Sequence, residues 1–315
     1  MGDRMKSTTV RRTASVVAVT AALAGVAACG SGGSSGGAAH RDGKAAAGET
    51  ARGGTATLAS PLTALRTAAD STGRADSARV DMTVSMGTLM SMKGHGALSW
   101  GHGLSGTLTL TYTGGTVADT MRATGTTSVQ ARYLPDAYYA RMSDAFAAQA
   151  GGKHWIRYGY DDMARLGGGS GAYLKDQMQN NTPNQAVKLL LASGDVKRAG
   201  EERIAGVHTT HYHGTVNVAD LAARTGHSLT AAQLADMKRQ LTDSGITTDT
   251  VDLWIDDRNL LVRKVESADT AKGALTTTAT YGDYGVKVAV GAPPRGDTAD
   301  FKELLAAQGA GAGAS

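Results

Sequence analysis

Cysteine and large aromatic residues are both scarce in this sequence. It has one cysteine, Cys29, among 315 residues, so no intramolecular disulfide can form. With only two Phe and three Trp, the hydrophobic core must consist mainly of Val, Leu, Ala, Met and Tyr. The apolar stretch at 16–26 is too short to span a membrane, which takes about 20 strongly apolar residues.

Basic residues do not gather into a patch. The whole sequence has 32 Lys and Arg against 28 Asp and Glu, a formal net charge of +4. Four of these basic residues and one acid lie within residues 1–28, which leaves 28 basic against 27 acidic residues in the remainder. The basic excess thus belongs largely to the N-terminal segment, and we expect no nucleic-acid partner.

Catalytic signatures are also missing. The sequence has no P-loop, no H-E-x-x-H motif and no EF-hand loop. A G-x-S-x-G pattern at 33–37 lies in a Gly/Ser-rich run without the strand and helix that a nucleophile elbow needs. The adjacent carboxylates Asp161–Asp162 and Asp256–Asp257 are expected to be solvated on turns. We therefore predict a protein that is not an enzyme and has no cofactor.

The N-terminal 28 residues have the layout of a secretory signal. Four basic residues precede the apolar stretch 16–26, and small residues lead directly to Cys29. This order resembles a bacterial lipoprotein signal, in which cleavage precedes a cysteine that then carries acyl chains. We predict that residues 1–28 are removed and that Cys29 anchors the protein to the extracytoplasmic face of the cell membrane. The alternative is a secreted protein with one unmodified thiol.

One domain follows the predicted anchor. Residues 29–56 are mostly Gly, Ser and Ala without apolar periodicity, which is typical of a flexible tether. Residues 57–307 are long enough for one substantial core, and residues 308–315 form an Ala/Gly tail predicted to be disordered. Nothing in the sequence requires an oligomer, so we expect a monomer.

Hydrophobic periodicity within the domain predicts an α+β fold. Residues 78–86 alternate between apolar and polar side chains, the signature of a strand with one buried face. Further strands are predicted at 97–100, 107–112, 128–133, 137–142, 154–158, 196–199, 203–218, 250–256, 260–267 and 274–281. Helices are predicted at 61–73, 161–166, 172–179, 184–192, 220–224, 231–241 and 299–306. Since the helices do not alternate one for one with the strands, a large antiparallel sheet is favoured.

Several pieces of the second half resemble one protein family. They are Gly206–Val216, the strand pair 252–256 and 261–265, Tyr281–Gly285 and Ala292–Pro294. Together with the N-terminal signal, they resemble actinobacterial cell-envelope lipoproteins of the LolA/LppX type. The resemblance implies a strongly curved antiparallel half-barrel with several helices packed over its concave face. It also implies a cavity that holds the acyl chains of a lipid or glycolipid.

Inward-facing residues of the predicted strands are the candidates for lining such a cavity. Methionine is adaptable enough to suit irregular apolar partners, and the sequence offers few bulky aromatic residues to fill the space. The candidates are Met82, Met86, Leu108, Leu110, Tyr139, Leu253 and Ile255. The alternative is that these side chains simply pack a filled core.

A histidine-rich strand is the remaining local feature. His211 and His213 are two residues apart and should face the same side, with His208 on the other side. Neutral imidazoles can bind zinc or copper, but no acid or cysteine is spaced to complete a ligand set. We therefore expect no metal site and a solvated strand face.

The sequence supports two main functional hypotheses, beside a third in which the lipoprotein binds a metal through His208, His211 and His213. The first is a membrane-anchored lipoprotein that binds or carries a lipid or glycolipid. The second is a non-enzymatic envelope module with a filled core, whose partner is another envelope protein, such as the extracellular domain of a sensor.

Overall fold

The structure is a computed structural model that describes residues 60–166, 175, 178–179, 181–193, 195–217, 248–270 and 273–312. The predicted signal, Cys29, the tether and the G-x-S-x-G pattern lie outside the described residues. So do the helices predicted at 220–224 and 231–241, and most of the one predicted at 172–179.

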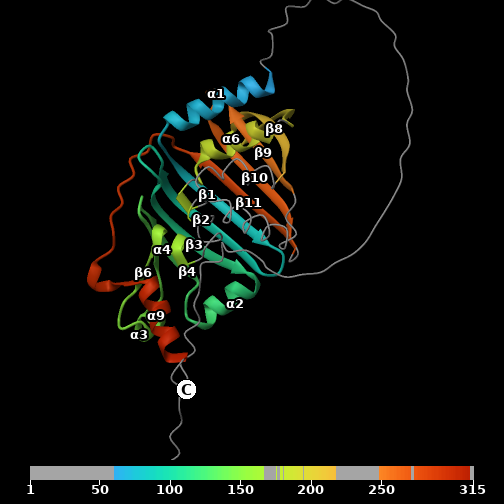
Figure 1. The fold of residues 1–315 in the computed structure, drawn as a ribbon. Coiled ribbons are helices and arrows are strands. Elements are labelled where there is room, and N and C mark those ends of the chain that lie inside the picture. Colours follow the sequence, from blue (N-terminus) through green and yellow to red (C-terminus); the bar gives the residue numbers. More distant parts are fainter. Residues whose placement is uncertain are drawn as a thin grey trace, which may run out of the picture.

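An open, curved sheet of twelve strands organises the described part of the chain (Figure 1). Its strands are β1 (Ser77–Met86), β2 (Met90–Ser99), β3 (Ser105–Gly114), β4 (Ser128–Tyr133), β5 (Ala137–Arg141), β6 (Trp155–Gly159), β7 (Lys197–Ile204), β8 (Val207–Asn217), β9 (Thr248–Asp256), β10 (Leu261–Thr270), β11 (Gly273–Gly282) and β12 (Thr298–Asp300). Their spatial order is β12-β6-β5-β4-β3-β2-β1-β11-β10-β9-β8-β7. All neighbours are antiparallel except β12 and β6, which are parallel. The predicted α+β fold with a large curved sheet is confirmed.

The sheet has two distinct faces. Because paired residues on neighbouring strands lie on the same face, the register shows which residues of each strand share a face. On β1, Val80 and Val84 are buried while Asp81 and Thr83 between them are exposed. We call the face that carries Val80 and its cross-strand partners the inner face, and the opposite one the outer face. The predicted alternation along 78–86 is therefore confirmed.

Helices cover parts of the inner face. They are α1 (Pro61–Arg74), α2 (Gly115–Ala123), α3 (Asp144–Gln149), α4 (Tyr160–Leu166), α6 (Pro183–Ser193) and α9 (Phe301–Ala312). Helix α6 contacts β8, β9 and β10, and α1 packs against α6, whereas α2 contacts β2 and β3. Figure 1 shows α1 and α6 at one end of the sheet and α2 at the opposite end. Side chains from these helices join the inner-face residues in one hydrophobic core.

Helix α1 begins where the sequence predicts it. The Ser60 hydroxyl accepts a hydrogen bond from the Thr63 backbone N–H at 3.3 Å, and proline occupies the first helical position. The helix buries Leu65, Ala68, Ala69 and Thr72, a spacing that places them on one face. At its far end, the Thr72 hydroxyl accepts a hydrogen bond from the Leu261 backbone N–H at 3.1 Å. This bond joins the first helix to β10.

The turn between β9 and β10 corrects the expectation for one of the paired carboxylates. Asp256 is 6% exposed and accepts hydrogen bonds from the backbone N–H groups of Arg258 and Leu260, at 2.9 and 2.8 Å. Asn259 has φ 63°, the left-handed conformation that asparagine tolerates in tight turns. Asp256 is therefore buried because it organises the turn, whereas its neighbour Asp257 is exposed.

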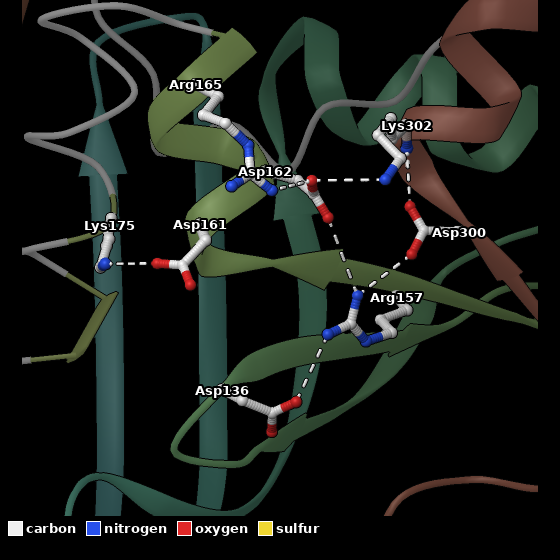
Figure 2. Close-up of polar contacts among 8 residues, drawn as sticks. All are labelled: Asp136, Arg157, Asp161, Asp162, Arg165, Lys175, Asp300 and Lys302. Carbon is white, nitrogen blue, oxygen red and sulfur yellow. Dashed lines mark hydrogen bonds and ion pairs between the residues drawn. The ribbon is translucent and has the colours of Figure 1, made fainter.

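The C-terminal segment is fastened to the β6 edge by an ion-pair network (Figure 2). The Arg157 guanidinium lies 3.3 Å from the Asp136 carboxylate and 3.1 Å from that of Asp300. Asp162 contacts Arg165 and Lys302, at 2.6 and 3.4 Å. The Asp162 side chain is only 15% exposed, so the predicted solvated pair at 161–162 is wrong for this residue.

Asp161, the other member of that pair, is 76% exposed and binds Lys175 at 2.7 Å. Both carboxylates thus take part in ion pairs with basic side chains. Neither is arranged with the other as an acid/base pair.

Several elements differ from their predicted extent. Strand β2 begins at Met90, whereas the sequence predicts a strand only from Ala97. Gly94 and Gly96 break the apolar alternation in the sequence, but both residues pair with β1 in the antiparallel ladder. Gly94 is required there, since a Cβ atom would lie 2.8 Å from the Cγ of Met82. Helices α2 and α3 and the short strand β12 were not predicted, and a turn at 205–206 divides the predicted strand 203–218.

Among the described helices, none combines the length and the apolar character that crossing a membrane requires.

The bond between α1 and β10 can be tested with a substitution that keeps side-chain shape. We expect Thr72→Val to lower the free energy of unfolding by about 1–3 kcal/mol, because the buried Leu261 N–H loses its acceptor. Urea unfolding followed by circular dichroism measures this change. Thr67→Val on the exposed side of the same helix is the control. Equal losses in the two variants would contradict the assigned role of Thr72.

Candidate functional site

Six of the seven predicted cavity residues lie on the inner face. Met82 and Leu110 point toward each other across Gly94, the residue that pairs with both of them in the ladder. Leu108 belongs to the same face of β3, and Met86 to the same face of β1. Leu253 and Ile255 lie on the inner face of β9 and belong to the main core. The alternation of the sequence therefore predicted a set of residues that shares one surface.

Tyr139 is the exception, and the structure corrects its assignment. It lies on the outer face of β5, where it packs with Ala137 and Trp155 in a separate small cluster. Its neighbours Tyr138 and Ala140 point to the inner face instead. All of residues 137–140 are buried, so hydrophobicity alone does not reveal which side of this strand faces inward.

Exposure separates the inner-face candidates into two groups. Leu108 and Leu110 are 2% and 7% exposed, and Leu253 and Ile255 are 0% and 5% exposed. These four side chains are packed core. Met82 and Met86 on β1, together with Leu275 on β11, are only partly buried. Partly exposed apolar side chains of the inner face therefore include a group near the junction of β1 and β11.

A charged cluster, not predicted from the sequence, lies on the same face. Lys264 is 4% exposed, and its Nζ atom donates to both Glu266 carboxylate oxygens, at 3.1 and 3.0 Å. It also lies 3.3 Å from the amide oxygen of Asn181, just before α6. Burial alone would lower the pKa of Lys264, but attraction to Glu266, Tyr281 and Asp249 raises it above the ordinary value. Lys264 therefore remains charged inside the protein.

Asp249 adds a second carboxylate to this cluster. Burial raises the pKa of its carboxyl to about 7, and repulsion by Glu266 acts in the same direction. Attraction to Lys264 and a hydrogen bond from the backbone of Ser267 only partly offset these effects. Among the described residues, the inner face thus holds two carboxylates near one ammonium group, that of Lys264.

A β-bulge explains why the sequence pattern did not reveal Lys264. The register between β9 and β10 shifts between Leu261 and Arg263, so that Leu261 pairs with Ile255 and Lys264 pairs with Leu253. Strict alternation from the buried Leu261 would have placed Arg263 inside and Lys264 outside. The extra residue of the bulge reverses this assignment. The spacing of apolar residues in the sequence does not reveal this bulge.

The histidine-rich strand lies on β8. His211 Nε2 and His213 Nδ1 lie 2.6 and 2.9 Å from the same Asp252 oxygen on β9. His211 also stacks on Trp254, with ring centroids 4.3 Å apart. His208 contacts Asp257 instead, at 2.9 Å. The sequence spacing did not reveal these carboxylate partners, because Asp252 and Asp257 come from β9 and the turn that follows it.

These contacts do not amount to a metal centre. Within the part of the chain that the structure describes, no three His, Cys, Asp or Glu side chains form a group that could hold an ion. His211 and His213 instead form hydrogen bonds with the Asp252 carboxylate on the outer face.

The raised pKa of Asp249 predicts a pH-dependent stability. The folded state binds more protons than the unfolded state between about pH 4 and pH 7, so this carboxyl's contribution is fully present below about pH 4. It is lost as the pH rises through about 7. We expect Asp249→Asn to flatten the pH dependence of the unfolding free energy over this window by at most about 4 kcal/mol.

Urea unfolding at pH 5 and pH 8 tests this expectation. Asp81→Asn removes an exposed carboxylate from the outer face of β1 and serves as the control. If Asp249→Asn keeps the pH dependence of the unsubstituted protein, the carboxyl is not desolvated as described.

Comparison with known proteins gives two bacterial relatives, although no family model matches the sequence. One is a Streptomyces coelicolor protein whose name describes it as a candidate lipoprotein. It is 51% identical over 311 residues, covering 97% of this chain and 100% of that protein. The other, from Streptomyces griseus, is a 31.2 kDa protein of the rplA–rplJ intergenic region. It is 54% identical over 258 residues, covering 82% and 84% of the two chains.

Two mycobacterial proteins are similar among solved structures. They are LprF from Mycobacterium bovis and the lipoprotein LppX from Mycobacterium tuberculosis, each with a TM-score of 0.44 and 16% identity. The matches cover 74% of this chain and 96% of LprF, and 73% of this chain and 98% of LppX. Because the chain is 51% identical to the Streptomyces coelicolor protein over that protein's whole length, it belongs to the same family of actinobacterial lipoproteins.

Proposed function

We propose that this protein is a lipid-anchored envelope protein that binds a lipid or glycolipid on the inner face of its sheet. The observation that carries the proposal is the strip of partly buried apolar side chains on that face, formed by Met82, Met86 and Leu275. Each methylene that moves from water onto such a surface contributes about 0.8 kcal/mol. A single acyl chain would thus supply ample binding energy.

The anchor is proposed to be Cys29. The basic residues, the apolar stretch 16–26 and the small residues before this cysteine support it, and so does membership of a lipoprotein family. Residues 1–28 would be removed, and residues 29–56 would tether the 57–307 domain to the extracytoplasmic face of the membrane. An extended residue spans at most about 3.6 Å, so this tether would let the domain lie up to about 100 Å from its anchor.

A second function is a non-enzymatic module that binds another envelope protein. The observation that favours it is the burial of Leu108, Leu110, Leu253 and Ile255, which supports a packed core over part of the inner face. In this reading the outer face would make the functional contacts. The two functions differ in whether acyl chains bind to the folded domain.

Lipidation is tested by substituting the cysteine. We expect the full chain expressed in a bacterial host to partition into the detergent phase of a Triton X-114 extraction, and Cys29→Ser to partition into the aqueous phase. Two acyl chains or more are needed for stable anchoring, so the difference should be nearly complete. Ser31→Ala, two residues further on, is the control. Unchanged partitioning of Cys29→Ser would show that another feature holds the protein at the membrane.

Ligand binding is tested by native mass spectrometry of the full chain carrying Cys29→Ser, followed by organic extraction. We expect a co-purifying lipid near one-to-one stoichiometry. Met86→Asp should reduce its occupancy by about tenfold or more, because a carboxylate replaces apolar surface on the inner face. Ser85→Asp places the same charge on the outer face at the adjacent residue and should leave occupancy unchanged. An unliganded mass that does not change after incubation with envelope lipids would favour the protein-binding module.

A further inference from the structure

Two rows of inner-face residues run from a carboxylate on β9 or β10 to apolar side chains on β1 and β2. The register aligns Asp249 on β9 with Ala268 on β10, Leu275 on β11 and Met86 on β1. Neighbouring strands are about 4.8 Å apart, so about 14 Å separates the carboxylate strand from the methionine strand. A row of side chains thus leads from a charged group to the partly buried apolar strip.

A second row repeats this arrangement. Glu266 on β10 pairs with Thr277 on β11, which pairs with Val84 on β1 and then Met92 on β2. Glu266 is 23% exposed and lies next to the buried Lys264. Both rows therefore carry a carboxylate at the β9–β10 end and apolar side chains at the β1–β2 end.

Among the described residues, the charges around Asp249 do not balance. Lys264 is the one ammonium group that these residues place there, and it already donates to Glu266 and Asn181. Among the described residues, Asp249 accepts a hydrogen bond from the backbone of Ser267 and has no ion pair as close as that between Lys264 and Glu266. The raised pKa of Asp249 agrees with a carboxyl that has lost water without gaining a full counter-charge. In a low-dielectric surrounding, such an excess of negative charge attracts a cation strongly.

We infer that the inner face selects an amphiphile with a cationic ammonium headgroup, which binds between Asp249 and Glu266 while its chain follows Leu275 and Met86. This inference rests on the proposed lipid binding and adds the charge class of the ligand. Lys264 neutralises only one of the two carboxylates, and a ligand ammonium group would supply further N–H donors and the second positive charge. An anionic headgroup would be repelled by the same carboxylates, since Lys264 is already neutralised.

Three single-chain probes of equal length test the inference: dodecylamine, dodecanol and dodecanoic acid. Each competes with the uncharged fluorescent probe N-phenyl-1-naphthylamine for the full chain carrying Cys29→Ser at pH 8, below its aggregation concentration. We expect dodecylamine to bind at least about tenfold more tightly than dodecanoic acid, with dodecanol between them.

Substitution of Asp249 locates the effect. Asp249→Asn should reduce the advantage of the amine over the acid to less than about threefold and leave dodecanol binding unchanged. Asp81→Asn removes the same charge from the outer face and should leave the order of the three probes unchanged. Because Asp249 is destabilised as a carboxylate, its replacement by Asn is not expected to impair folding.

The remaining outcomes separate the two proposals. Equal binding of the three probes, or a preference for the acid, overturns the charge selectivity while lipid binding stands. Failure of the fluorescent probe and all three amphiphiles to bind overturns the proposed lipid binding, and the inference with it.

Discussion

An open sheet of twelve strands has one face that must be kept from water, and most of the described structure serves this requirement. Helices α1 and α6 cover the inner face over β8–β10, and α2 covers it at β2 and β3. The Thr72–Leu261 bond joins this cover to the sheet. Between the covered regions, Met82, Met86 and Leu275 remain partly buried. The proposed ligand surface is thus the part of the described inner face that these helices leave partly exposed.

The charged residues of the inner face, Lys264, Glu266 and Asp249, are not explained by a gain in stability. A buried ion pair such as Lys264–Glu266 generally stabilises a fold no better than apolar residues of similar volume. Asp249, with its raised pKa, costs stability at neutral pH. An apolar surface would bind any acyl chain, whereas one with a fixed charge pattern can discriminate between headgroups. The cluster therefore gives the proposed site a chemical preference that the methionines cannot provide.

The sequence predicted those features that depend on regular periodicity. Alternation placed Met82, Leu110 and Leu253 on one face, and the cap at Ser60 marked the start of α1. The sequence did not reveal the features that depend on contacts between strands distant in the chain. The bulge after Leu261 reverses the orientation of Lys264, and Tyr139 lies in a strand buried on both faces. Asp252 meets His211 only because β8 and β9 are neighbours in space. In each case, the orientation or partner of the side chain depends on how neighbouring strands pair.

Strand β12 and its ion-pair network have a consequence for how the chain reaches its native state. Thr298 pairs with Trp155, and Asp300 binds Arg157 from 143 residues away in the sequence. Strand β1 likewise pairs with β11, about 200 residues later. Such distant pairings make folding slow, because long loops must close before their contacts form. The described sheet therefore cannot be completed before residues 298–300 have been synthesised, so strands β1 and β6 must await partners that are made much later.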